Sequence, residues 1–169
     1  MMLKIKKNAS KIHVTEITKI ALITSLYIVI TTFLSVISFG AFQLRLSEMF
    51  NFLPLFHKRY IWAVTLGVAI ANFNSPLGIT DVLVGSISTF IVLKIIQQVT
   101  KNIENMKLKF IITAIIFSFS MFTVAGMLCV FYDLPFFYTW LTVGIGELFS
   151  MTIGGILIYN LHQRIDLTH

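Results

Sequence analysis

Four ionisable residues lie inside long apolar runs of this sequence: Arg45, Glu48, Asp81 and Glu147. A charged side chain in a hydrocarbon environment is costly unless it is paired or hydrated, so each is a candidate for a binding site. Arg45 and Glu48 are three residues apart, so on a helix they share a face and can neutralise each other. In that case Asp81 and Glu147 have no evident basic partner, which favours a positively charged ligand or one rich in N–H donors.

These carboxylates, with the uncharged amide of Asn72 as a companion, suit a flat nitrogen heterocycle. A carboxylate accepts two parallel N–H bonds, and a guanine-type edge presents its donors in a matching layout. Asp81 has a second interpretation as the N-cap of a helix, whereas Glu147 lies well inside its run. Aromatic residues near these positions could stack on such a ring or form an interfacial belt: Phe39, Phe42, Phe73, Tyr132, Phe136, Phe137, Tyr138 and Trp140.

Motifs for the common enzyme chemistries do not occur in this sequence. It has no G-x-x-x-x-G-K-[ST] phosphate loop, no H-E-x-x-H helix and no G-x-S-x-G elbow. The single cysteine, Cys129, excludes a disulfide framework and a cysteine-based metal site. We therefore expect a binding protein that is not an enzyme, with no cofactor and no metal ion.

The composition indicates that lipid is the solvent for much of the chain. Of its 169 residues, 57% are hydrophobic and 12% are charged, which is more apolar surface than one soluble core can bury. The net charge of +6 does not indicate nucleic-acid binding, because the basic residues fall between apolar runs. We expect one transmembrane domain over residues 1–169, with a short basic cytoplasmic segment at 1–16.

Six apolar runs approach the roughly 20 residues that a helix needs to cross a bilayer. They are Ile17–Ile37, Ser38–Phe56, Tyr60–Phe73, Asp81–Val99, Leu108–Phe131 and Tyr138–Leu161. With the N-terminus inside, every lysine and arginine except Arg45 falls on the cytoplasmic side, as the positive-inside rule requires. The sequence therefore predicts an all-α integral membrane bundle of six transmembrane helices with both termini cytoplasmic.

Small residues four positions apart mark three of these runs, and such spacing lets helices approach closely in lipid. The sets are Ala21 and Ser25; Ala63, Gly67 and Ala71; and Gly146, Ser150 and Gly154. Packing inside the bundle is the favoured interpretation of the second and third sets. The first set lies at the cytoplasmic end of its run, where a partner subunit could also dock.

Four motifs occur in order along the chain: R-x-x-E at 45–48, G-x-x-x-A-N at 67–72, S-P-x-G-x-x-D at 75–81 and G-x-G-E at 144–147. With the residues around them, they resemble the QueT family. Its members are substrate-binding (S) components of energy-coupling factor (ECF) transporters associated with queuosine precursors. The family would also place a polar amide in the fifth helix, where this chain has only Ser118 and Ser120.

The resemblance implies an S component in a prokaryotic plasma membrane that works with a transmembrane coupling subunit and two cytoplasmic ATPases. Its substrate would be a 7-deazaguanine, preQ0 or preQ1, with Glu147 and Asp81 accepting ring N–H groups. Asn72 would contact a ring carbonyl or the substituent, and Arg45 and Glu48 would shape the pocket wall. Small residues on the first helix would contact the coupling subunit, and Ala21 and Ser25 occupy that place.

Two alternatives remain open from the sequence. One is an S component for another vitamin-like heterocycle, such as a flavin or a thiamine-like compound. The other is a self-contained channel or proton-coupled carrier in which Glu147 carries the proton.

Overall fold

The computed structural model of the chain describes residues 2–38 and 43–168. Within these ranges the chain forms seven α-helices and two 3-10 helices and contains no strand. The elements in order are α1 (Met2–Phe33), α2 (Ser35–Ser38), η1 (Leu46–Leu55), α3 (Arg59–Ala71), η2 (Asn72–Asn74), α4 (Ile79–Thr100), α5 (Met106–Ser120), α6 (Phe122–Tyr132) and α7 (Phe136–His162).

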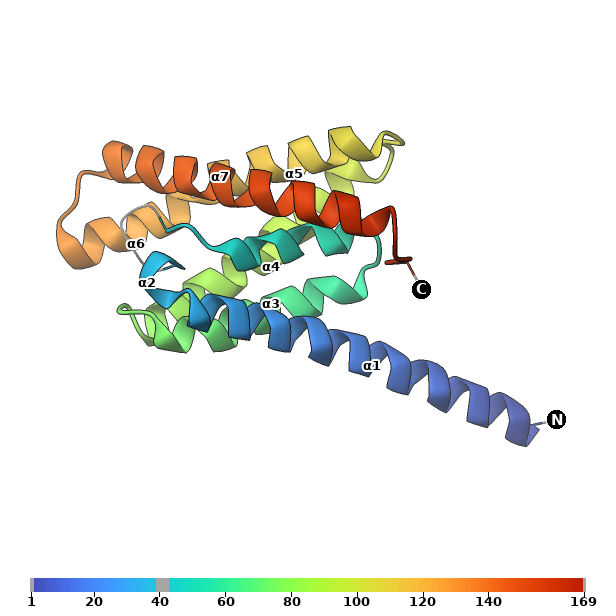
Figure 1. Ribbon diagram of the computed structural model, residues 1–169. Coiled ribbons are helices and arrows are strands. Elements are labelled where there is room, and N and C mark those ends of the chain that lie inside the picture. The colour runs from blue at the N-terminus through green and yellow to red at the C-terminus, as the bar shows by residue number, and fades with distance from the viewer. Residues whose placement is uncertain (1, 39–42, 169) are drawn as a thin grey trace.

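The elements run back and forth along one long axis (Figure 1). α1 begins at the same end of the molecule at which α7 ends, and it extends beyond the other helices there. The main neighbours are α1 with α3, η1 with α7, α3 with α4, and α5 with α7. The 3-10 helix η1 therefore lies between the N-terminal and the C-terminal parts of the bundle.

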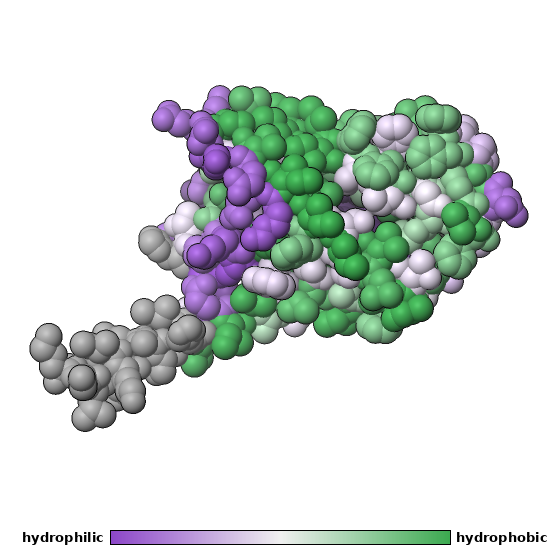
Figure 2. Space-filling view, turned by 180° about the vertical axis from the view of Figure 1, so that it is seen from behind, coloured by the Kyte–Doolittle hydropathy of each residue, from purple (hydrophilic) through white to green (hydrophobic). Residues whose placement is uncertain are grey.

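Within the described residues, four stretches of helix are long and apolar enough to cross a membrane: Val14–Phe33, Ile79–Thr100, Met106–Tyr132 and Phe136–His162. Hydrophilic residues gather at one end of the face drawn in Figure 2, and hydrophobic residues cover most of the rest. Large apolar side chains such as Trp62, Ile91 and Phe149 are more than half exposed. An apolar surface around long helices is the arrangement of a multi-pass membrane protein.

The helix ends agree with three predicted runs and correct two features at the N-terminal side. α3, α4 and α7 match the third, fourth and sixth runs within two residues. α1 begins at Met2 rather than Ile17, because the segment before Ile17 contains no glycine or proline and several lysines, which are good helix formers. The predicted basic segment contains Lys4, Lys6, Lys7 and Lys11, whose side chains the structure does not describe.

The second predicted span, Ser38–Phe56, is not one α-helix. α2 ends at Ser38, residues 39–42 lie outside the described residues, and 43–45 have no regular secondary structure before η1 begins. A 3-10 helix aligns side chains three residues apart, so Glu48, Asn51 and Pro54 form one row, and all three are buried. The hydropathy of this run correctly indicated that it is buried. The chain nevertheless forms an irregular segment and a 3-10 helix here instead of one α-helix.

The fifth predicted span is interrupted at Met121, which separates α5 from α6. The Ser120 hydroxyl donates to the Phe117 carbonyl at 2.7 Å, and the Thr123 hydroxyl donates to the Ser120 carbonyl at 3.0 Å. Hydroxyls that bond to backbone carbonyls one turn earlier compete with the helical hydrogen bonds and bend the helix. The break occurs beside the candidate site described below.

Close helix contacts explain two of the three sets of small residues. A Cβ atom on Gly67 of α3 would lie 2.8 Å from the Tyr27 Cβ atom of α1, and one on Gly154 of α7 would lie 2.7 Å from the Met49 Cα atom of η1. The prediction that these sets pack inside the bundle is confirmed. Among the described glycines of α7, Gly154 lies closest to η1.

We predict that Gly154→Ala lowers the free energy of unfolding by about 1–3 kcal/mol, because the new methyl group overlaps the backbone of η1. Gly126→Ala is the matched control, since a Cβ atom at Gly126 meets nothing within 4 Å. It should leave stability unchanged or raise it by up to about 1 kcal/mol through helix propensity. Thermal unfolding of both variants in the same detergent measures the difference, and equal midpoints would contradict the packing argument.

Candidate functional site

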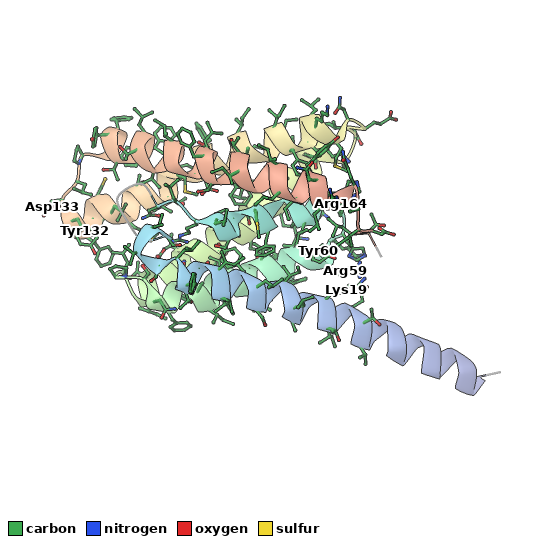
Figure 3. All side chains as sticks on the ribbon, viewed as in Figure 1. Lys19, Arg59, Tyr60, Tyr132, Asp133 and Arg164 are labelled. Atoms are coloured by element: carbon green, nitrogen blue, oxygen red, sulfur yellow. The ribbon has the colours of Figure 1, made fainter. Side chains whose placement is uncertain are left out.

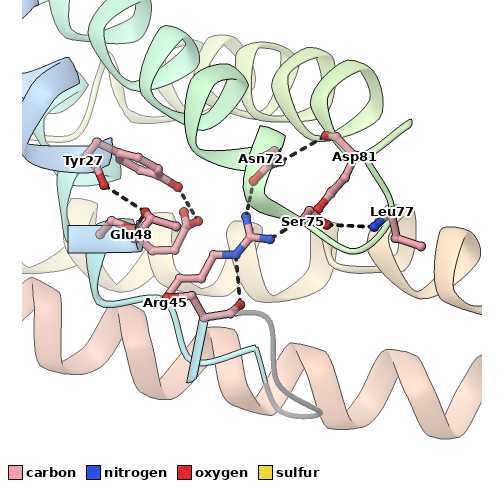
Figure 4. A network of polar contacts seen from close by, with 10 residues as sticks. Tyr27, Arg45, Glu48, Asn72, Ser75, Leu77 and Asp81 are labelled. Atoms are coloured by element: carbon pink, nitrogen blue, oxygen red, sulfur yellow. Dashed lines mark hydrogen bonds and ion pairs between the residues drawn. The ribbon is translucent and has the colours of Figure 1, made fainter. Parts of the chain in front are cut away.

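Arg45 is the centre of a buried polar network (Figure 4). Its Nε atom donates to the Ser38 carbonyl at 3.3 Å and one terminal nitrogen donates to Asn72 Oδ1 at 3.2 Å. The other terminal nitrogen lies 3.7 Å from Asp81 Oδ2. Arg45 reaches this far because it precedes η1 in extended backbone, with φ −102° and ψ 100°.

Glu48 is held by α1 and by a residue of its own 3-10 helix. The Tyr27 hydroxyl donates to Glu48 Oε1 at 2.7 Å, and the Asn51 side-chain nitrogen donates to Oε2. Arg45 and Glu48 do not share a helix face as predicted, because Arg45 precedes η1 in extended backbone. Arg45 makes an ion pair with Asp81, so the expectation that Asp81 lacks a basic partner is wrong.

Asn72 and Asp81 complete this network at the start of α4. The Asn72 side-chain nitrogen donates to the Asp81 carbonyl oxygen at 3.0 Å, so both ends of the Asn72 amide are bonded. Gly85 makes room for this side chain, since a Cβ atom there would lie 2.5 Å from Asn72 Nδ2. Asp81 is not the N-cap of α4, because Gly78 occupies that position with φ 55°.

Glu147 is the buried carboxylate that the protein leaves unsatisfied. It lies within α7 with 3% of its surface exposed, and its Oε1 atom has no hydrogen-bond partner in the described part of the chain. Among residues 2–38 and 43–168, no other carboxylate oxygen is both buried and without a partner. A buried acceptor of this kind is costly without a donor, so it is suited to receive one from a ligand.

Two connected cavities lie at this network. The outer cavity, of about 520 Å³, is bounded by the turn at 75–77, by α6, by the turn at 134–135 and by the start of α7. The inner cavity, of about 40 Å³, is lined by Arg45, Glu48, Asp81 and Glu147 among others. The outer volume lies in the range of small-molecule sites, whereas the inner one has room for only about three water molecules.

The structure thus brings four of the five predicted site residues to one cavity and places Asn72 behind its wall. The turns that contain Pro76 and Pro135 both border the outer cavity. Of the candidate aromatic residues, Tyr132 and Tyr138 line it, whereas Phe39 and Phe42 lie outside the described residues. That these side chains bind a substrate stays a prediction.

Sequence reasoning missed Gln43, Thr123 and Val124, which line the inner cavity. Gln43 is two residues before Arg45, and an uncharged amide next to an arginine gave no separate signal. Thr123 and Val124 reach the cavity through the break between α5 and α6, which the apolar pattern did not predict. No group of three or more potential metal ligands occurs within the described residues.

Ala21 and Ser25 lie on a different part of the protein, the outer face of α1. Both are exposed, as are the neighbouring Leu22, Leu26 and Val29. The Ser25 hydroxyl donates to the Ala21 carbonyl at 2.8 Å, so Ser25 presents a small surface whose polar group is already bonded. The opposite face of the helix packs on α3, with the Thr24 hydroxyl donating to the Ala63 carbonyl at 2.9 Å.

Residues 17–163 match the sequence model of the family described as QueT transporter. The chain belongs to the QueT family. It is 38% identical over 162 residues to the queuosine precursor transporter QueT of Lactococcus lactis subsp. cremoris (strain MG1363), which covers 90% of this chain and 95% of that protein. No solved structure matches this QueT-family chain.

We predict that Arg45→Gln lowers the free energy of unfolding by about 3–5 kcal/mol, because it leaves the Asp81 carboxylate buried without its cation. Adding Asp81→Asn should recover part of the loss, since the two side chains are directly coupled. Arg164→Gln, at an exposed arginine near the other end, is the control and should have little effect. Thermal unfolding without ligand compares the wild type with these variants and with Asp81→Asn alone, and additive effects in the double variant would contradict the proposed pairing.

Proposed function

We propose that this chain is the substrate-binding subunit of an ECF-type importer that takes up a queuosine precursor of the 7-deazaguanine type, preQ0 or preQ1. The observation that carries the proposal is the unpartnered Oε1 atom of Glu147 beside the inner cavity. It is a buried acceptor in a family whose Lactococcus member is named as a queuosine precursor transporter.

The ring would lie in the outer cavity, where Tyr132 and Tyr138 offer aromatic faces. Its N–H donors would point toward the inner cavity and bond to Glu147 and to Asp81, which borders both cavities. Arg45 and Glu48 form the wall around these carboxylates, each fixed by the bonds described above. Asn72 would act from behind the wall by holding Arg45 in place.

We further propose that the chain crosses the cell membrane six times with both termini in the cytoplasm. η1 and α3 would complete the passes made by the four long apolar stretches. The distribution of charge supports this orientation, because Lys19, Arg59 and Arg164 lie at one end and Asp133 lies at the other (Figure 3). Basic residues at cytoplasmic ends follow the positive-inside rule, so the outer cavity would open on the outside of a prokaryotic cell.

Transport would depend on partner subunits, namely a transmembrane coupling subunit and two cytoplasmic ATPases. The sequence has no phosphate loop of its own. The exposed strip of small and apolar residues around Ala21 and Ser25 gives the coupling subunit a surface for close helix packing. The proposed partner site is thus separate from the substrate site but on a helix that contacts it through Tyr27.

We predict that Glu147→Gln lowers the affinity for preQ0 or preQ1 by about 10–100-fold, because a charge-assisted acceptor is lost. Asp81→Asn should weaken binding in the same direction. Glu104→Gln, at an exposed glutamate between α4 and α5, is the matched control and should bind normally. Titration calorimetry on the purified protein, with flavin and thiamine as competing ligands, measures these affinities.

Unchanged precursor affinity in both Glu147→Gln and Asp81→Asn would contradict the site assignment. Tighter binding of the flavin or of thiamine would contradict the substrate assignment.

We predict that Ser25→Leu abolishes uptake with the coupling subunit and ATPases in proteoliposomes while leaving substrate affinity unchanged, because a bulky side chain prevents close helix packing. Thr152→Leu on α7 is the control, since its exposed hydroxyl also bonds to a carbonyl four residues earlier. It should retain uptake. Accumulation by this chain alone, driven by a proton gradient, would contradict the need for partners.

A further inference from the structure

Gln43 occupies the junction of the two cavities. It lines both the outer and the inner cavity, a position that it shares with Asp81 and Val124. It belongs to the irregular segment that leads into η1, two residues before Arg45. A ligand that fills the outer cavity and reaches toward the inner one must therefore pass beside this side chain.

The Gln43 carboxamide is available for such a ligand. Within residues 2–38 and 43–168, no hydrogen bond involves its side chain, and Gln43 is not among the described residues with further interactions. The residue also has φ 46°, in the left-handed region that glutamine seldom adopts. Strained backbone of this kind tends to occur where a side chain is held for function, and here it sets an unbonded amide at the cavity junction.

A 7-deazaguanine ring needs a donor and an acceptor side by side, and none of the five predicted residues offers both without a partner. Its lactam edge carries a ring N–H beside a carbonyl oxygen, so a complementary site needs one acceptor and one donor side by side. Glu147 and Asp81 can only accept when ionised. Asn72 has both ends bonded, and the Arg45 guanidinium is held by Asp81, Asn72 and the Ser38 carbonyl.

The threonine hydroxyls beside the outer cavity already use their protons in bonds to the backbone. The Thr139 and Thr142 hydroxyls donate to backbone carbonyls one turn earlier, at 2.9 Å each. The Ser75 hydroxyl oxygen accepts from the Leu77 N–H at 3.2 Å. An amide carries a donor and an acceptor side by side, and Gln43 holds one without a partner at the right place.

We propose that Gln43 is the specificity-determining residue that recognises the lactam edge of the substrate. Its amide nitrogen donates to the ring carbonyl, and its amide oxygen accepts the adjacent ring N–H. Gln43 thereby supplies, from the segment before η1, the amide that the fifth helix lacks. This inference rests on the proposed function, because it assumes a 7-deazaguanine ring in the outer cavity.

Gln43→Met provides the test because it keeps a side chain of similar length and removes both the donor and the acceptor of the amide. A lactam edge loses two bonds in this variant, whereas a ring without the carbonyl and the ring N–H has no such pair to lose. The ligand pair is therefore 7-deazaguanine and 2-amino-7-deazapurine, and titration calorimetry on the purified full chain gives the ratio of their affinities. Gln98→Met, the same change at an exposed position near the far end of α4, is the control.

We expect the wild-type protein and Gln98→Met to prefer 7-deazaguanine. Gln43→Met should bind 7-deazaguanine at least about tenfold more weakly and lose much less affinity for the aminopurine, so the ratio of the two affinities falls. Gln43→Gly is a second variant that removes the amide and relieves the strain at positive φ. It should unfold at the same or a higher temperature and show the same fall in the ratio.

An unchanged affinity ratio in Gln43→Met and Gln43→Gly, which includes an equal fold-loss for both ligands, would overturn the assignment of Gln43. In that case binding of 7-deazaguanine by the wild type would leave the proposed function intact. Failure of the wild type to bind 7-deazaguanine at all would instead overturn the proposed function, and this inference with it.

Discussion

The ion pair between Arg45 and Asp81 is the interaction on which the rest of the site depends. A guanidinium buried in an apolar bundle needs a counter-ion and acceptors for its other N–H groups. Asp81, Asn72 and the Ser38 carbonyl supply them from three different elements. To meet these partners, the chain leaves helical geometry at 43–45 and makes room at Gly85. The arrangement of the cavity wall is therefore a consequence of giving one buried cation its hydrogen-bond and ion-pair partners.

Once Arg45 has its partners, the charges of the site do not balance within the protein. Glu48 is bonded to Tyr27 and Asn51, and Asp81 to Arg45, while Glu147 keeps an acceptor without a donor. A protein optimised for stability alone would not retain such a group, and the cost is consistent with a site that is completed by its ligand. The same logic applies to the unbonded amide of Gln43, which lies at a strained position.

α1 connects this site to the outside of the bundle. One of its faces is held by the hydrogen bonds from Tyr27 to Glu48 and from Thr24 to the Ala63 carbonyl, and by the close contact of Tyr27 with Gly67. The other face carries Ala21 and Ser25, exposed among apolar side chains. A helix bonded so directly to the pocket wall is a rigid element, so the substrate site and the proposed docking surface share one structural support.

The sequence by itself determined the positions of α3, α4 and α7, because long apolar runs bounded by turn residues such as Pro76, Gly78 and Pro135 permit little else in lipid. It also identified Arg45, Glu48, Asp81 and Glu147, since ionisable groups in apolar runs are too costly to be incidental. Only the tertiary structure decided which of them pair, that η1 is a 3-10 helix, that α5 breaks at Met121, and that Gln43 lies at the cavity junction. Each of these features depends on hydrogen bonds or close contacts between residues distant in sequence, or on local competition for a backbone carbonyl. A hydropathy pattern contains no information about either kind of interaction.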